Sequence, residues 1–295
     1  MKEFEEKIKL AESFESEKKF LHALQIYQSL ALNEDYRSVA QIKLAALYEK
    51  MGQIEKSYSS LNKYLDAHPG DQRVRKFFIQ FLIKNGEYGK AVEEANYFDL
   101  EKEPMIYMLV GLAYYYMDDF KMALLNFNNY IDSSENELLS EAYFYIGSCY
   151  LKTGDYDKAM VFIKKSEAIY SLNPELHLVK GMIYFHKKML YHSLDAIQKA
   201  EALDHQSTLI KEWKSRILLE LGELEKAEDS LKDLLEKDKL KSDNYSLLGI
   251  IYLKQGNANE AVKCFKNALS LNPEDETALQ GLAECKDVSE EINKN

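Results

Sequence analysis

Residue types recur along this chain with a period of 34 residues, and this period restricts the possible folds more than any other feature. It is clearest from Tyr245 to Pro273. With Ser242 counted as position 1, small residues occupy positions 8, 20 and 27, and large residues occupy positions 4, 7, 11 and 24. Positions 4, 7, 8 and 11 form one apolar stripe of a helix. The period therefore predicts helix–turn–helix units that stack on their neighbours.

The same residue types recur in seven other windows, with a few departures. The third unit carries the bulky Ile79 at position 8, and the sixth carries Lys188 where other units have a turn glycine. The register slips by two residues before Pro104 and is restored at Ser140. The predicted units start near residues 4, 38, 72, 104, 140, 174, 208 and 242.

This pattern resembles the tetratricopeptide repeat (TPR), a helix–turn–helix unit of 34 residues. The resemblance implies an all-α, right-handed superhelical solenoid of about eight TPR-like repeats over residues 4–275. Residues 276–295 are expected to form a C-terminal capping helix and a polar tail. Small residues at positions 8 and 20 would let paired helices approach closely, and large residues at 11 and 24 would fill the space between successive pairs. Asp155, which follows the turn residue Gly154, is expected to cap a second helix.

Charge and cysteine usage restrict the class of protein. The net charge of −11 disfavours nucleic acid as a partner. Cys149, Cys264 and Cys285 lack disulfide or metal spacing, which favours reduced thiols in the core. The N-terminus is densely charged and lacks a signal-peptide core, and the apolar run Met105–Met117 is too short to cross a bilayer. We therefore expect a cytoplasmic protein without membrane insertion.

No motif in the chain indicates an enzyme. Gly86 and Gly89 precede Lys90, but two residues instead of four separate the glycines of this pseudo-phosphate loop. The motifs HExxH and GxSxG do not occur. The histidines are scattered, so we expect no catalytic residue, no metal and no cofactor. Trp213 is expected to pack between units, with a place in a binding groove as the alternative.

A second stripe of each first helix, at positions 2, 5, 9, 12 and 13, points away from the predicted core. In TPR proteins this stripe lines the concave groove where partner peptides or helices dock, so the resemblance implies a binding surface here. The stripe is basic in the third unit and apolar from the fourth to the sixth. The candidate groove residues are Arg73, Lys76, Gln80, Lys84, Met105, Met108, Leu112, Tyr115, Tyr116, Phe144, Ser148, Lys152, Leu178, Met182 and Phe185.

Within this set, the large apolar side chains are expected to anchor a partner, while Arg73, Lys76 and Lys84 orient its acidic flank. The alternative is that the apolar helix after Pro104 is covered by the chain itself. The carboxylate clamp of chaperone-binding TPR domains is absent, because Gln80 replaces one of its asparagines and Glu141 stands where a lysine is needed.

The function that we expect from the sequence is a non-enzymatic scaffold or adaptor that binds a peptide or helix of a protein partner in the groove. One alternative is a peptide-sensing regulatory TPR receptor, with hinges at residues 99–104 and 132–137. Another is a self-assembling scaffold, a homo-oligomer whose groove holds a neighbour's end.

Overall fold

The computed structural model describes residues 2–133, 137–237 and 240–292. In this part of the chain, helices α1 to α16 form eight helix–turn–helix pairs, α17 follows them, and no strand occurs. The all-α repeat fold predicted from the sequence is therefore confirmed. The chain divides into two compact units, Met1–Leu138 and Leu139–Asn295. The predicted hinge at residues 132–137 lies partly outside the described residues.

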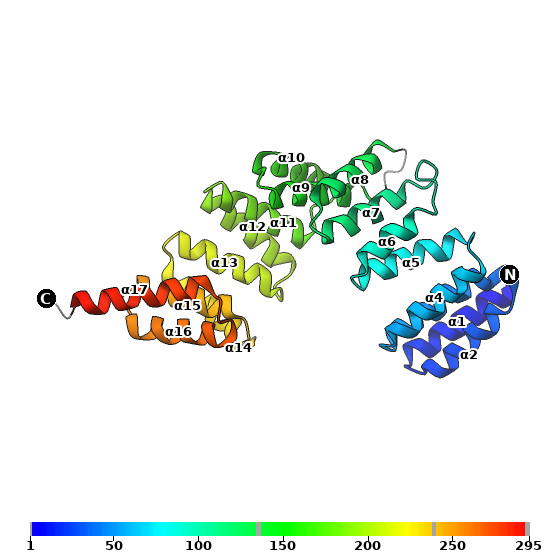
Figure 1. The fold of residues 1–295 in the computed structure, drawn as a ribbon, viewed down its shortest axis with the longest axis horizontal. Helices are drawn as coiled ribbons and strands as arrows, with labels where there is room; N and C mark the ends of the chain where they lie inside the picture. The colour runs from blue at the N-terminus through cyan, green and yellow to red at the C-terminus, as the bar shows by residue number, and fades with distance from the viewer. Residues whose placement is uncertain (1, 134–136, 238–239, 293–295) are drawn as a thin grey trace. The chain divides into compact units, whose positions relative to one another are not determined.

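The first unit contains the first four helix pairs (Figure 1). Its α6 is only 8 residues long and is followed by a connection over residues 96–104, where the register slips. The elements of this unit are α1 (Lys2–Ser16), α2 (Phe20–Ala31), the 3₁₀ helix η1 (Glu34–Tyr36), α3 (Arg37–Lys50), α4 (Ile54–Ala67), α5 (Gln72–Lys84), α6 (Tyr88–Ala95), α7 (Met105–Tyr116) and α8 (Phe120–Asp132).

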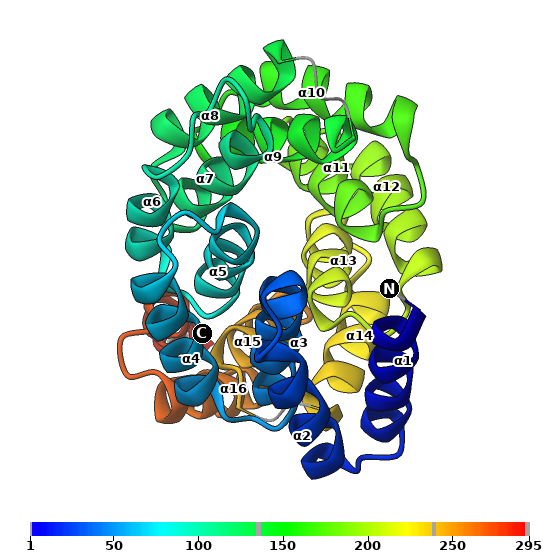
Figure 2. The same ribbon diagram turned by 90° about the vertical axis from the view of Figure 1, so that its right-hand side faces the viewer.

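The second unit contains four further pairs and α17, and its paired helices, such as α11 and α12, lie side by side in both views (Figure 2). Asp155 caps α10 as predicted, because its Oδ1 accepts a hydrogen bond from the Lys158 amide at 3.1 Å. The helices are α9 (Leu139–Lys152), α10 (Tyr156–Ile169), α11 (Pro174–His186), α12 (Leu190–Leu203), α13 (Thr208–Glu220), α14 (Leu224–Lys237), α15 (Ser242–Lys254), α16 (Ala258–Leu271) and α17 (Glu276–Ile292).

The turn inside each pair uses one backbone conformation whether or not glycine is present. Gly154 has φ +82° and Lys188 has φ +58°, both in the left-handed region. In each turn the next amide donates to a carbonyl five residues back, Asp155 to Tyr150 and Met189 to Tyr184, both at 2.9 Å. Lys188 therefore adopts a glycine conformation and carries the strain that this imposes on a residue with a Cβ.

Replacing Lys188 with glycine is therefore expected to raise the free energy of unfolding by about 0.5 kcal/mol, because relief of the strain outweighs the greater flexibility of the unfolded chain. Urea denaturation followed by circular dichroism would measure the change. The reciprocal control, Gly154→Ala, should lower stability by about 1 kcal/mol. A Lys188→Gly variant less stable than the parent would contradict this account of the turn.

Position 8 of each first helix faces position 24 of its paired second helix, and their sizes are complementary. A Cβ built on Gly147 would lie 2.8 Å from Cδ1 of Ile163, and one on Gly181 would lie 2.7 Å from Cδ1 of Ile197. The large residue at position 24 therefore packs within its own pair and fills the space left by the small residue. The small–large pairs are Ala11 and Tyr27, Ala45 and Leu61, Gly111 and Phe127, Gly147 and Ile163, Gly181 and Ile197, Ser215 and Leu231, and Gly249 and Phe265.

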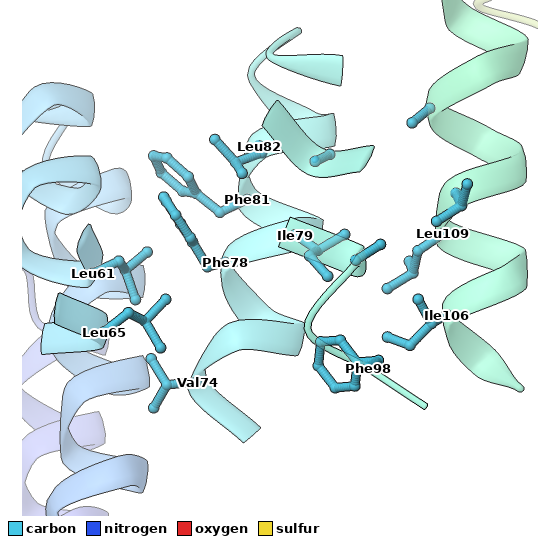
Figure 3. Close-up of a cluster of buried hydrophobic side chains, with 14 of the residues drawn as sticks. Leu61, Leu65, Val74, Phe78, Ile79, Phe81, Leu82, Phe98, Ile106 and Leu109 are labelled. Carbon is cyan, nitrogen blue, oxygen red and sulfur yellow. The ribbon is translucent and has the colours of Figure 1, made fainter. Parts of the chain in front are cut away.

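The third pair reverses this order. Ile79, the residue that departs from the repeat pattern, faces position 24 occupied by Ala95, and both side chains are buried in one core cluster. Figure 3 shows Ile79 of α5 pointing toward Phe98 and Ile106, while Phe78 points toward Leu61 of α4. The bulky residue is thus accommodated because its partner is small, and α5 packs on both sides.

Two repeats carry serine instead of alanine at position 20, and a hydrogen bond to the paired helix explains why serine is tolerated there. The Ser193 hydroxyl donates to the Gly181 carbonyl at 2.7 Å, and the Ser57 hydroxyl donates to the Ala45 carbonyl at 2.9 Å. Both serines are fully buried, and this bond satisfies a polar group that would otherwise be costly there. Serine therefore replaces the expected alanine without disturbing the close contact of the two helices.

Candidate protein-binding surface

The predicted surface begins on α5 in the first unit, where its basic side chains have partners within the chain. Lys76 Nζ lies 2.6 Å from Oε2 of Glu103, and Lys84 Nζ lies 3.0 Å from Oε1 of Glu49. Arg73 is exposed and forms no ion pair among the residues that the structure describes. The positive charge offered to a partner by this part of the surface is therefore mainly that of Arg73.

A depression lies between the first helices α3 and α5 of this unit. It has a volume of about 370 Å³, and Ile42 of α3 and Phe77 of α5 provide its apolar lining. Arg73, Lys76 and Gln80 also line it. Three of the predicted surface residues are thus brought together around a shallow apolar site.

The apolar helix α7 offers less surface than its sequence indicates. Met108 is only 2% exposed, whereas Met105, Leu112 and Tyr115 are half-buried. Tyr116 is 48% exposed, and its ring stacks on Tyr88 of α6 at 5.4 Å between centroids. Of the predicted residues on α7, Tyr116 is the most exposed.

In the second compact unit, Leu139–Asn295, the residue at position 5 of a repeat's first helix is directed into the core. Phe144 shares a cluster with Ile183 of α11, and Leu178 shares a cluster with Ile210 of α13, so each packs against the next repeat. The Ser148 hydroxyl donates to the Phe144 carbonyl at 2.9 Å in its own helix. Phe144, Ser148 and Leu178 are therefore buried and offer no direct contact to a partner, and Lys152 stays exposed.

The remaining predicted residues of the second unit lie beside an aromatic patch, which we define as Tyr156, Phe185, His186 and Trp213. The His186 ring stacks on Tyr156 at 5.0 Å, and Trp213 meets Phe185 edge to face at 5.6 Å. Met182 packs against the same core cluster as Phe185 and Trp213. His186 is exposed and the three other rings are half-buried.

Trp213 was not among the predicted site residues, although it is the one tryptophan of the chain. It lies on α13 and contacts rings of the preceding repeat, which agrees with the expected packing between units. Since it is only half-buried, it also contributes surface next to His186. The signal that could have found it is its place one turn from the position-9 residue Arg216.

The pKa of His186 is lowered because the aromatic rings packed around its imidazole partly remove it from water, and because Lys188 places a like charge nearby. Trp213 fluorescence should therefore fall on acidification with a midpoint below the ordinary histidine pKa of about 6.5, because an imidazolium quenches a neighbouring indole. Below that pH the unfolded chain takes up the proton more readily, so this residue also lowers stability there. A pH titration of fluorescence tests this, and a transition that persists in His186→Gln would contradict the assignment.

The cysteines are buried thiols whose pKa is raised. All three cysteines are free and buried, and burial raises the pKa of Cys149 to about 12 and that of Cys264 to about 11. No cluster of metal-ligating side chains occurs within the described residues. The thiols are therefore packing groups held in their protonated form at neutral pH.

No helix in the described ranges is long and apolar enough to cross a membrane.

Comparison with known families identifies the repeats. Tetratricopeptide repeat models match residues 39–71, 140–171 and 243–275, which lie in both units. The chain contains tetratricopeptide repeats in both compact units. The confirmed repeat includes the stretch from Tyr245 to Pro273, where the 34-residue period is clearest.

Two curated relatives of this TPR protein extend the comparison over most of its length. Anaphase-promoting complex subunit 3 of Schizosaccharomyces pombe is 24% identical over 309 residues, covering 92% of this chain and 46% of the relative. The TPR repeat-containing protein MJ1428 of Methanocaldococcus jannaschii is 26% identical over 341 residues, covering 100% of this chain and 58% of the relative. The TPR protein thus spans roughly half the length of these relatives.

Solved structures share the fold of the TPR protein. The APC/C hetero-tetramer Cut9–Hcn1 matches with a TM-score of 0.70 at 15% identity, covering 90% of this chain and 52% of that chain. YrrB, described as a TPR protein with an unusual peptide-binding site, matches with a TM-score of 0.50 at 20% identity, covering 65% of this chain and 96% of that chain. The matched repeats and the shared fold are those of tetratricopeptide repeat solenoids.

Proposed function

We propose that this TPR protein is an adaptor that holds a peptide or helix of a protein partner against its first helices. The observation that carries the proposal is the aromatic patch of the second unit, where an exposed His186 lies beside half-buried Phe185 and Trp213. Tryptophan and tyrosine dominate the binding energy of many interfaces, because they bury a large area at little entropic cost.

The surface around the patch supports binding of an amphipathic segment. Met182 offers a flexible apolar side chain near the patch, and exposed Lys152 offers a charge on the preceding first helix. Met105, Leu112, Tyr115 and Tyr116 form the corresponding surface on α7 of the first unit. An apolar partner face with polar edges is the chemistry that such a surface fits.

The relatives support the same class of function. One is named as a subunit of a multi-protein complex, and one structural neighbour is described as having a peptide-binding site. Membership of a complex and a peptide-binding site both involve contact with another polypeptide, which is the role that we infer for this chain.

A single charge in the patch tests the proposal. His186→Glu places a carboxylate among the aromatic rings without creating a cavity, and it should weaken binding of a purified partner at least tenfold. The matched control is His192→Glu, the same substitution at an exposed histidine of the second helix α12. Partners would be recovered with the wild-type protein, purified, and titrated against each variant while Trp213 fluorescence is followed. Equal affinities of the two variants, with unchanged helical melting, would contradict the proposal.

A further inference from the structure

The depression between α3 and α5 in the first unit has a lining that selects for a particular chemistry. Ile42 and Phe77 provide half-buried apolar surface, and Gln80 adds an exposed amide. The volume of about 370 Å³ is in the range of sites that hold a small ligand or a side chain of a partner. The site lies wholly within one compact unit and is separate from the aromatic patch.

Of the charged side chains that line this depression, two form an ion pair with each other and one forms no ion pair among the described residues. Lys76 is bound to Glu103 at 2.6 Å, and the two side chains are 33% and 34% exposed. Arg73 also lines the depression and has no ion pair among the described residues. The charges of Lys76 and Glu103 cancel, so the charge of Arg73 gives the lining a net charge of +1. The chain as a whole has a net charge of −11. An acidic ligand is therefore favoured here over a neutral or basic one.

We propose that this depression is a second binding site, which takes an apolar side chain of a partner protein next to a carboxylate. The apolar side chain packs on Ile42 and Phe77, and Arg73 binds the carboxylate. Glu103 is an internal competitor, because it occupies the ammonium group of Lys76 that an incoming carboxylate would otherwise share. The inference rests on the proposed function only in that the ligand is a segment of a protein.

The Lys76–Glu103 pair gives the proposal an unusual test, because one substitution should tighten binding. Removing the charge of Glu103 leaves two unopposed cations around the depression, Arg73 and Lys76. Removing the charge of Arg73 leaves none. Destabilised folding could produce a loss of affinity but not a gain, so the two variants separate a binding role from a structural one.

The probe is the dipeptide N-acetyl-Leu-Glu-amide, with N-acetyl-Leu-Gln-amide and N-acetyl-Leu-Lys-amide as neutral and basic controls. Binding to the full chain would be measured from NMR chemical-shift changes. We expect the acidic probe to bind about fivefold more tightly than the neutral one and the basic probe to bind most weakly. Equal binding of the acidic and neutral probes, or no binding of any probe, would overturn the proposal.

Three variants complete the experiment. Arg73→Gln should lower the affinity for the acidic probe about fivefold, and Glu103→Gln should raise that affinity by a similar factor. Lys90→Gln, on α6 of the same repeat and paired with Glu87 at 3.0 Å, is the matched control and should change binding less than twofold. An Arg73→Gln variant with unchanged affinity, or a Glu103→Gln variant with lower affinity, would refute the assigned roles. His186→Glu should leave dipeptide binding intact, so a failure here is distinguishable from a failure of the aromatic patch.

Discussion

Replacing Gly249 with alanine is expected to lower the free energy of unfolding by about 3 kcal/mol, because the packing around this glycine leaves no room for a methyl group. The ring of Phe265 lies between Gly249 of α15 and Gly281 of α17. A Cβ on Gly249 would lie 2.5 Å from Cε1 of this ring, and a Cβ on Gly281 would be closer still to Cζ. The ring cannot retreat from one helix without approaching the other, so Gly281→Ala should have an effect of similar size. Urea denaturation measures both.

A second-site change should rescue the Gly249→Ala variant. Phe265→Leu converts the Gly249–Phe265 pair into an alanine–leucine pair, the combination that the second repeat uses at Ala45 and Leu61. The double variant should therefore recover at least half of the lost stability. The matched control is Gly89→Ala in α6, where a Cβ meets nothing within 4 Å and helix propensity should raise stability by about 0.5 kcal/mol. Additive effects of the two substitutions would show that the ring is not the obstacle.

Replacing Lys241 with methionine is expected to cost about 2 kcal/mol, because it leaves the carboxylate of Glu212 buried without its partner. Glu212 is 5% exposed, and its two carboxylate oxygens lie 2.5 and 2.6 Å from Nζ of Lys241. The cost falls below that of a fully buried pair because the lysine side chain is 40% exposed. Thermal melts of the full chain would measure it.

Two variants separate the buried charge from a general effect of losing a lysine. Lys199→Met removes the partner of Asp195 in an exposed pair at 2.7 Å, and it should cost less than about 0.5 kcal/mol. The double variant Glu212→Met with Lys241→Met replaces the pair by apolar side chains and should return stability close to that of the parent. A Lys241→Met variant as stable as Lys199→Met would show that the pair contributes little.

Much of the fold could be predicted from the sequence, because the repeat period records both helices and the turn of each unit. The small residue at position 8 and the capping role of Asp155 follow from residue type and spacing alone. The sequence pattern alone did not explain why the bulky Ile79 is tolerated at position 8. The explanation is the small Ala95, sixteen residues later at position 24. A pairwise rule that compares positions 8 and 24 would have found it.

The candidate surface was harder to predict, because exposure and charge depend on neighbouring repeats. Periodicity assigns position 5 to the outward stripe, yet Phe144 and Leu178 pack against the next first helix. The ion pairs of Lys76 and Lys84 join residues 27 and 35 positions apart, a distance at which no helical rule operates. Trp213 joins Phe185 and His186 only once adjacent repeats are stacked.

Because one small and one large side chain pair at positions 8 and 24 of the same repeat, the pairing affects how a chain of such repeats can gain or lose repeats. Each small–large couple, including the inverted couple of Ile79 and Ala95, is encoded within a stretch of 17 codons. A duplication or deletion of one whole repeat therefore carries both members of the couple together. Phe265 also leaves no room for a side chain at Gly281 in the following helix. A duplication that ended after α16 would therefore separate Phe265 from Gly281, whereas one that included α17 would keep the two together.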